Sequence, residues 1–150
     1  MTDYEQIEIL LAEDNPADAE LALRALAKNN FANKVHWVKD GAEVLEFIHG
    51  TDRYAGRTAS QMPKLLLLDL KMPKMDGLEV LRHLKANAAT RLIPVVMMTS
   101  SNEEQDVVES YKLGVNSYIV KPVDFQQFVD TVAETGLYWV LANRAPHGAA

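Results

Sequence analysis

Five short apolar runs alternate with longer amphipathic segments, and this alternation constrains the fold more than any other feature of the chain. The apolar runs are Ile7–Ala12, Lys34–Val38, Leu65–Asp69, Ile93–Thr99 and Ser117–Val120. The four successive leucines that begin at Leu65 are apolar on both faces of an extended chain, as in a central parallel strand that helices cover on both sides. The pattern predicts an α/β fold: a doubly wound, five-stranded parallel sheet with right-handed crossovers and helices on both faces.

Residues that cap helices stand at the start of the amphipathic segments. Four segments begin with a side chain that accepts hydrogen bonds, followed three positions later by Glu or Gln, so that two free backbone N–H groups can be satisfied. The pairs are Asp40 and Glu43, Asp76 and Glu79, Ser101 and Glu104, and Asp124 and Gln127. The first segment instead follows Asn15, with Pro16 at the favoured first helical position. These signatures predict a helix after each strand.

Length and composition exclude several classes of protein. The 150 residues suit one domain with a substantial core. A formal net charge of −6 argues against a nucleic-acid partner. The absence of cysteine removes disulfides, thiolate metal sites and cysteine nucleophiles. No apolar run approaches the ~18 residues that span a bilayer, and the acidic N-terminus lacks the start of an export signal. We therefore expect a cytoplasmic, soluble protein with no membrane partner.

Two segments exceed what the sheet and its helices require. The long loop 51–63 is rich in Gly, Ser, Thr and Pro and contains Arg53 and Arg57; we expect a solvated connection, the alternative being a partner-contacting loop. A C-terminal helical extension at about 133–145 contains Tyr138 and Trp139. An aromatic pair beyond the sheet predicts a homodimer contact, the alternative being that Trp139 folds back on its own domain.

Polar side chains stand at the C-terminal ends of four predicted strands: Glu13 and Asp14, Asp69, Thr99, and Lys121. In a doubly wound sheet, ligands bind beyond this edge. Three carboxylates placed together repel one another unless a cation joins them, and Mg²⁺ is commonly held by carboxylates and phosphate oxygens. Each residue alone has an ordinary structural explanation, such as a strand end or a loop acid. Their joint placement indicates phosphoryl transfer.

The residues also resemble a known family, the receiver domains of two-component response regulators. The matching features are Glu13-Asp14, the stretch Asp69-Leu-Lys-Met-Pro-Lys-Met-Asp-Gly77, Thr99 and Lys121-Pro122. They match in order and strand context, and the resemblance covers about residues 7–132. It implies a flavodoxin-like sheet of strand order 2-1-3-4-5. It also implies a single receiver domain over 1–150, with no output domain.

The resemblance implies a phosphoacceptor and a metal site. Asp69 would attack a phosphohistidine of a sensor histidine kinase and form an acyl phosphate. Asp14, Asp69 and the backbone carbonyl of Lys71 would ligate Mg²⁺, with Glu13 acting through water. Such a chain catalyses its own phosphorylation and dephosphorylation and is not a classical turnover enzyme.

The same resemblance implies a switch. Lys121 would pair with Asp69 and then with a phosphoryl oxygen, and Pro122 would follow a cis peptide bond. The Thr99 hydroxyl would move to another phosphoryl oxygen. Tyr118 would turn inward with it and change the face built by the fourth helix, fifth strand and fifth helix. The alternative for Tyr118 is a half-buried strand aromatic with no such role.

Within the family, three features resemble the small stand-alone regulators paired with bacterial phytochromes. They are the loop 51–63, the sequence Thr99-Ser100-Ser101, and the aromatic pair Tyr138-Trp139. This resemblance implies a phytochrome as the partner kinase.

Two other functions are alternatives to this one. A haloacid dehalogenase-like phosphotransferase or phosphatase also uses Asp, Mg²⁺ and Lys, but it needs Asp-x-Asp, and Lys71 stands two residues after Asp69. That family also places its nucleophile on the first strand. A phosphorylation-independent adaptor would not need the retained Asp14, Asp69, Thr99 and Lys121.

Overall fold

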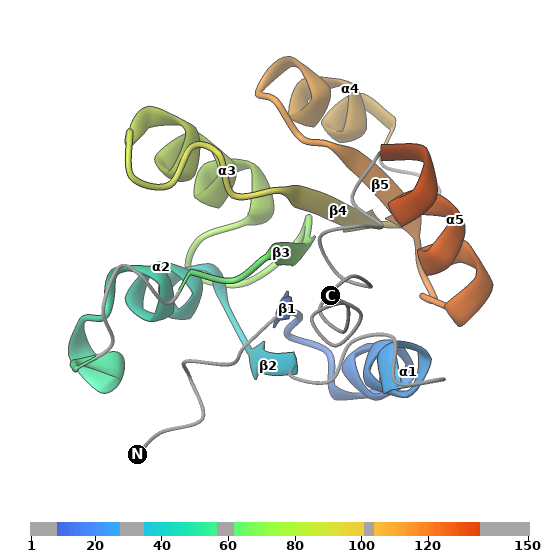
Figure 1. Ribbon diagram of the computed structural model, residues 1–150, viewed down its shortest axis with the longest axis horizontal. Coiled ribbons are helices and arrows are strands. Elements are labelled where there is room, and N and C mark those ends of the chain that lie inside the picture. Colours follow the sequence, from blue (N-terminus) through green and yellow to red (C-terminus); the bar gives the residue numbers. More distant parts are fainter. Residues whose placement is uncertain (1–8, 28–34, 57–61, 101–103, 136–150) are drawn as a thin grey trace, which may run out of the picture.

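A computed structural model of the chain describes residues 9–27, 35–56, 62–100 and 104–135 (Figure 1). One parallel sheet has the strand order β2-β1-β3-β4-β5, which confirms the predicted order. The strands are β1 (Ile9–Ala12), β2 (Val35–Val38), β3 (Leu65–Asp69), β4 (Val95–Thr99) and β5 (Ser117–Val120). The helices are α1 (Pro16–Ala27), α2 (Gly41–His49), α3 (Gly77–Ala86), α4 (Glu104–Lys112) and α5 (Phe125–Thr135), with a 3₁₀ turn, η3 (Asp52–Tyr54), after α2.

Helices cover both faces of the sheet, as predicted. Figure 1 shows α1 and α5 on one side and α2, α3 and α4 on the other. The leucines of β3 explain why both faces need a cover, because successive strand side chains point in opposite directions. Leu66 and Leu68 pack with α2 and α3, while Leu65 and Leu67 pack with α1 and α5. All four are fully buried, and each contributes about 2 kcal/mol of hydrophobic stabilisation.

The strand boundaries follow the apolar runs closely, with one difference. β3 and β5 have the predicted bounds, and the predicted first residues of the first two strands lie outside the described residues. β4 begins at Val95, two residues later than predicted. Ile93 instead closes a turn, in which its N–H donates to the Thr90 carbonyl at 3.1 Å. An apolar run therefore marks burial more reliably than it marks the first ladder residue.

The predicted caps form at the helix starts that the structure describes. Asp40, Asp76 and Asp124 each accept a hydrogen bond from the N–H three residues later, at 2.8, 3.0 and 2.8 Å. In a simple capping box, the Glu or Gln side chain accepts a hydrogen bond from the N–H of the cap residue itself. Two of the pairs here use a different backbone N–H. The Glu43 carboxylate accepts from the N–H of Lys39, and the Gln127 amide oxygen accepts from the N–H of Val120. Ser101, the remaining predicted cap, lies outside the described residues.

In the described part of the long loop, residues 51–56, every residue except one is exposed, so the solvated connection stays the expectation and a single buried side chain anchors it to the domain. Tyr54 in η3 is buried, and its hydroxyl donates to a Glu43 carboxylate oxygen at 2.6 Å. Arg53 pairs with Glu46 of α2 at 2.8 Å. The polar composition of the loop hid this anchor, because one tyrosine can bury its ring while its hydroxyl remains bonded. Arg57 lies outside the described residues.

The last helix keeps its predicted apolar face over the described residues. Phe128 and Val132 of α5 are fully buried against the sheet. Most of the predicted extension, with Tyr138 and Trp139, lies outside the described residues, so its role in a homodimer stays a prediction. Among the segments described, no helix combines the length and apolarity needed to cross a bilayer.

Candidate functional site

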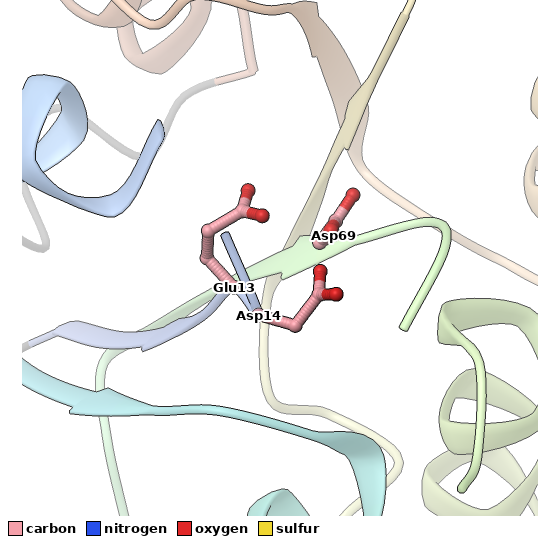
Figure 2. Close-up of side chains that lie close together, drawn as sticks. All are labelled: Glu13, Asp14 and Asp69. Carbon is pink, nitrogen blue, oxygen red and sulfur yellow. The ribbon is translucent and has the colours of Figure 1, made fainter. Parts of the chain in front are cut away.

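The parallel strands bring the predicted polar residues to one edge of the sheet. β1 and β3 are neighbours, so Glu13 and Asp14, which follow β1, lie beside Asp69 at the end of β3 (Figure 2). β4 and β5 are also neighbours, and the N–H of Lys121 donates to the carbonyl of Thr99 at 2.8 Å. Residues more than a hundred positions apart therefore meet because parallel strands end at a common edge.

Three carboxylates cluster at this edge. One oxygen from each of Glu13, Asp14 and Asp69 lies within 4.8 Å of the others. Glu13 and Asp69 are 1% exposed, whereas Asp14 is exposed. Figure 2 shows the side chains gathered beyond the ends of the two strands. Oxygen donors alone, two of them buried, are a donor set that suits a hard divalent cation.

Lys121 lies against the acid cluster. Its Nζ lies 3.1 Å from Asp69 Oδ1, 3.2 Å from Glu13 Oε1 and 3.4 Å from Asp18 Oδ2. The peptide bond between Lys121 and Pro122 is cis, as the resemblance implied. Asp18, on α1, was not among the predicted site residues, because an acid in the first turn of a helix is ordinary.

Burial makes the charges of this cluster costly. Burial and, after it, the Glu13 carboxylate raise the pKa of Asp69 from 3.8 to about 8, although the Lys121 ammonium opposes them. Burial alone would lower the pKa of Lys121, but the Asp69 and Glu13 carboxylates outweigh it and raise that pKa above its ordinary value. A divalent cation among these oxygens would favour the ionised form of Asp69. The residues present therefore fit a bound metal ion.

The loop after β3 wraps closely around Asp69. The N–H of Lys71 points to Asp69 Oδ1 at 3.4 Å. Gly77 passes so near that a Cβ there would lie 2.5 Å from the Asp69 carbonyl oxygen. Any side chain at Gly77 would thus displace the backbone of Asp69. A pocket of about 420 Å³ opens beside this loop, lined by Asp14, Lys71, Met72, Pro73 and Asp76.

The two predicted switch residues lie on neighbouring strands. Thr99 is buried at the end of β4, and its hydroxyl donates to the Ser100 carbonyl at 3.1 Å. Tyr118 of β5 is 40% exposed, with its ring edge-on to Tyr111 of α4 at 6.1 Å between centroids. A pocket of about 660 Å³ lies between α4 and β5, and both Thr99 and Tyr118 line it. The Tyr118 side chain therefore points outward in this structure, with the open space of the pocket beside it.

Trp37 also supports the site and was not predicted to do so. Its indole Nε1–H donates to the backbone carbonyl of Glu13 at 2.7 Å, across 24 residues of sequence. The bond holds the backbone from which Glu13 and Asp14 extend. In the sequence, Trp37 reads only as an aromatic residue of an edge strand.

Replacing Trp37 with phenylalanine keeps an aromatic ring and removes this donor. We expect Mg²⁺ affinity to fall about 3- to 10-fold and the free energy of unfolding to fall by about 1 kcal/mol. Isothermal titration with Mg²⁺ and urea unfolding measure the two effects. Lys39→Gln is the matched control, because it removes the cation over the Trp37 ring and leaves the indole bond intact. Equal Mg²⁺ affinity in Trp37→Phe and the unsubstituted chain would contradict a supporting role.

A doubly wound sheet of this order, with an acid cluster and a lysine at its carboxyl edge, defines the receiver class of signalling domains. The chain matches the response regulator receiver domain over residues 9–133 and belongs to that family. It is similar to the bacteriophytochrome response regulator AtBRR, with 51% identity, a TM-score of 0.80, and coverage of 92% of this chain and 98% of AtBRR. It is also similar to the bacteriophytochrome response regulator RtBRR, with 47% identity, a TM-score of 0.82, and coverage of 93% of this chain and 84% of RtBRR. The probable methanogenesis regulatory protein FilR2 of Methanothrix harundinacea is 40% identical over 92% of this chain and 86% of FilR2.

Proposed function

We propose that this response regulator accepts a phosphoryl group on Asp69 from a sensor histidine kinase, with Mg²⁺ bound at the acid cluster. The observation that carries the proposal is the contact between Lys121 Nζ and Asp69 Oδ1, at 3.1 Å, inside a cluster of three carboxylates. A buried carboxylate with raised pKa, a fixed ammonium and a set of oxygen donors together fit phosphoryl transfer.

The roles of the residues follow from their positions. Asp14, Asp69 and the backbone carbonyl of Lys71 would hold the cation, with Glu13 acting through water. When bound, Mg²⁺ neutralises the negative charge that gathers around a phosphoryl group. A carboxylate oxygen of Asp69 forms the new bond to phosphorus as the phosphorus–nitrogen bond of the phosphohistidine breaks, and the imidazole keeps that electron pair. Lys121 then balances charge on a phosphoryl oxygen.

The product is an acyl phosphate on the chain itself. The chain takes part in its own phosphorylation and hydrolysis, and it does not turn over a separate substrate. The order of the residues disfavours the haloacid dehalogenase alternative, since Asp69 ends β3 and Lys71 stands at the position where that chemistry needs a second aspartate.

We also propose that Thr99 and Tyr118 carry the signal outward. A phosphoryl group adds about −1.5 to −2 of charge and three acceptor oxygens near the end of β4. The Thr99 hydroxyl would leave the Ser100 carbonyl for one of these oxygens. The pocket between α4 and β5 gives Tyr118 room to follow, which would change the exposed face of α4, β5 and α5.

The partner that the comparisons favour is a phytochrome kinase. Two regulators named for bacteriophytochromes are 51% and 47% identical to this chain, against 40% for FilR2. A shared receiver fold alone would not distinguish among kinases, because function resides in surfaces and sites and not in the fold.

Phosphotransfer profiling tests this pairing. The chain is mixed with autophosphorylated histidine kinases, one of them a bacterial phytochrome and several without a light-sensing module. We expect the phytochrome to transfer its labelled phosphoryl group at least ~10-fold faster than the others, as a cognate docking surface would allow. Faster transfer from a kinase that is not a phytochrome would overturn the pairing and leave the phosphoacceptor proposal intact.

A further inference from the structure

Lys121 has a carboxylate partner that does not belong to the acid cluster. Its Nζ lies 3.4 Å from Asp18 Oδ2, besides its contacts with Glu13 and Asp69. Asp18 comes from α1, 103 residues earlier in the chain, and its side chain is 33% exposed. Glu13 and Asp69 are instead buried among the cluster oxygens. Asp18 is thus the most exposed of these three carboxylates.

The backbone N–H of each residue in this ion pair is hydrogen-bonded, which holds the two main-chain segments in place. The N–H of Asp18 donates to the Asn15 side-chain oxygen at 3.0 Å, which caps the start of α1. The N–H of Lys121 donates to the carbonyl of Thr99 at 2.8 Å. The Lys121 side chain therefore bridges the end of β5 and the first turn of α1.

Phosphorylation would change two of the three carboxylates that contact Lys121 in the described part of the chain. An Asp69 oxygen becomes the bridging oxygen of the acyl phosphate, and the cluster to which Glu13 belongs is the proposed metal site. Asp18 is the partner that both events leave unchanged. Without it, the ammonium on the flexible four-carbon stem of the lysine would lose the contact that, among its carboxylate contacts within the described residues 9–27, 35–56, 62–100 and 104–135, persists through the reaction.

We propose that Asp18 is a positioning residue that holds the Lys121 ammonium over Asp69 during phosphoryl transfer. The inference rests on the proposed function, because it assigns Lys121 to the phosphoryl group. The competing explanation is that Asp18 only complements the dipole of α1. That role would affect the stability of the helix and leave the transfer rate unchanged.

The test compares Asp18→Asn, Asp18→Glu and the control Glu20→Gln with the unsubstituted full-length chain. Glu20 is an exposed acid on the same helix that pairs with Arg24. Phosphorylation by acetyl phosphate at saturating Mg²⁺ is followed by intact mass, and Mg²⁺ affinity is measured by titration. We expect Asp18→Asn to slow phosphorylation about 3- to 5-fold, a size typical of a partly exposed ion pair, with Mg²⁺ affinity within about 2-fold. Asp18→Glu should restore most of the rate, and Glu20→Gln should react normally.

Four other results would contradict the positioning role of Asp18 or the proposed function. Asp18→Asn reacting at the normal rate would overturn the positioning role. An equal slowing by Glu20→Gln would assign the effect to the general charge of α1, and a parallel loss of Mg²⁺ affinity would assign it to the metal site. No phosphate on the unsubstituted chain would instead overturn the proposed function. Thermal melting of each variant shows that the rates come from folded protein.

Discussion

An Asp69→Asn variant is expected to gain no phosphate from acetyl phosphate and Mg²⁺, whereas the unsubstituted chain gains one phosphate that is labile at alkaline pH. The amide keeps the shape of the buried side chain but removes the nucleophilic oxygen, so the rate should fall at least ~1000-fold. Intact mass spectrometry measures the addition, and alkaline treatment distinguishes an acyl phosphate from a stable ester.

Asp130→Asn is the matched control, because Asp130 is an exposed carboxylate of α5. It should gain phosphate normally. Phosphate on Asp69→Asn at the normal level would place the acceptor elsewhere. No phosphate on the unsubstituted chain would favour the phosphorylation-independent adaptor.

The Asp69→Asn substitution should also change how the stability of the metal-free protein depends on pH. The pKa of Asp69 is raised from 3.8 to about 8 by burial and by Glu13, so the folded state binds this proton more tightly than the unfolded state. The stability that Asp69 contributes is therefore complete below about pH 4 and is lost as the pH rises toward 8. At pH 7.5 in chelator, Asp69→Asn should be more stable by about 1–3 kcal/mol, since loss of the Lys121 pair offsets part of the gain. Urea unfolding at pH 4 should show little difference.

Asp14→Ala should produce the largest effect on metal binding. Asp14 is exposed and lies within 4.8 Å of the Asp69 and Glu13 oxygens, so its removal deletes a ligand without opening the core. We expect Mg²⁺ affinity to fall about 10- to 100-fold. Phosphorylation should be slow at low Mg²⁺ and recover as Mg²⁺ is raised. A chelator should stop the reaction of both proteins.

The control for this prediction is Glu134→Ala, which removes an exposed acid of α5 far along the chain from the cluster. Titration calorimetry with Mg²⁺ should give it normal affinity. Unchanged affinity in Asp14→Ala would mean that the cation binds away from the acid cluster. Loss of phosphorylation that high Mg²⁺ does not restore would give Asp14 a role other than metal binding.

The elements of the fold could be predicted where the chain carries a local signal. The leucine run of β3 and the caps at Asp40, Asp76 and Asp124 depend on near neighbours in sequence, and the structure bears them out. The start of β4 and the burial of Tyr54 were missed for the opposite reason. An apolar run does not say where a ladder begins, and a polar loop does not show which of its side chains finds a partner.

The residues of the site also divide into those that the local sequence predicts and those that only the tertiary structure reveals. Asp69 ends a strand and Glu13, Asp14 and Lys121 follow strands. Because parallel strands end at one edge, the local sequence was enough to expect these residues together. Asp18 and Trp37 carry no such signal. Their contacts span 103 and 24 residues, and one is an ordinary first-turn acid while the other is an ordinary strand aromatic. Periodicity and caps act over a few residues, whereas these two contacts exist only because the packed sheet brings α1 to β5 and β2 to the end of β1.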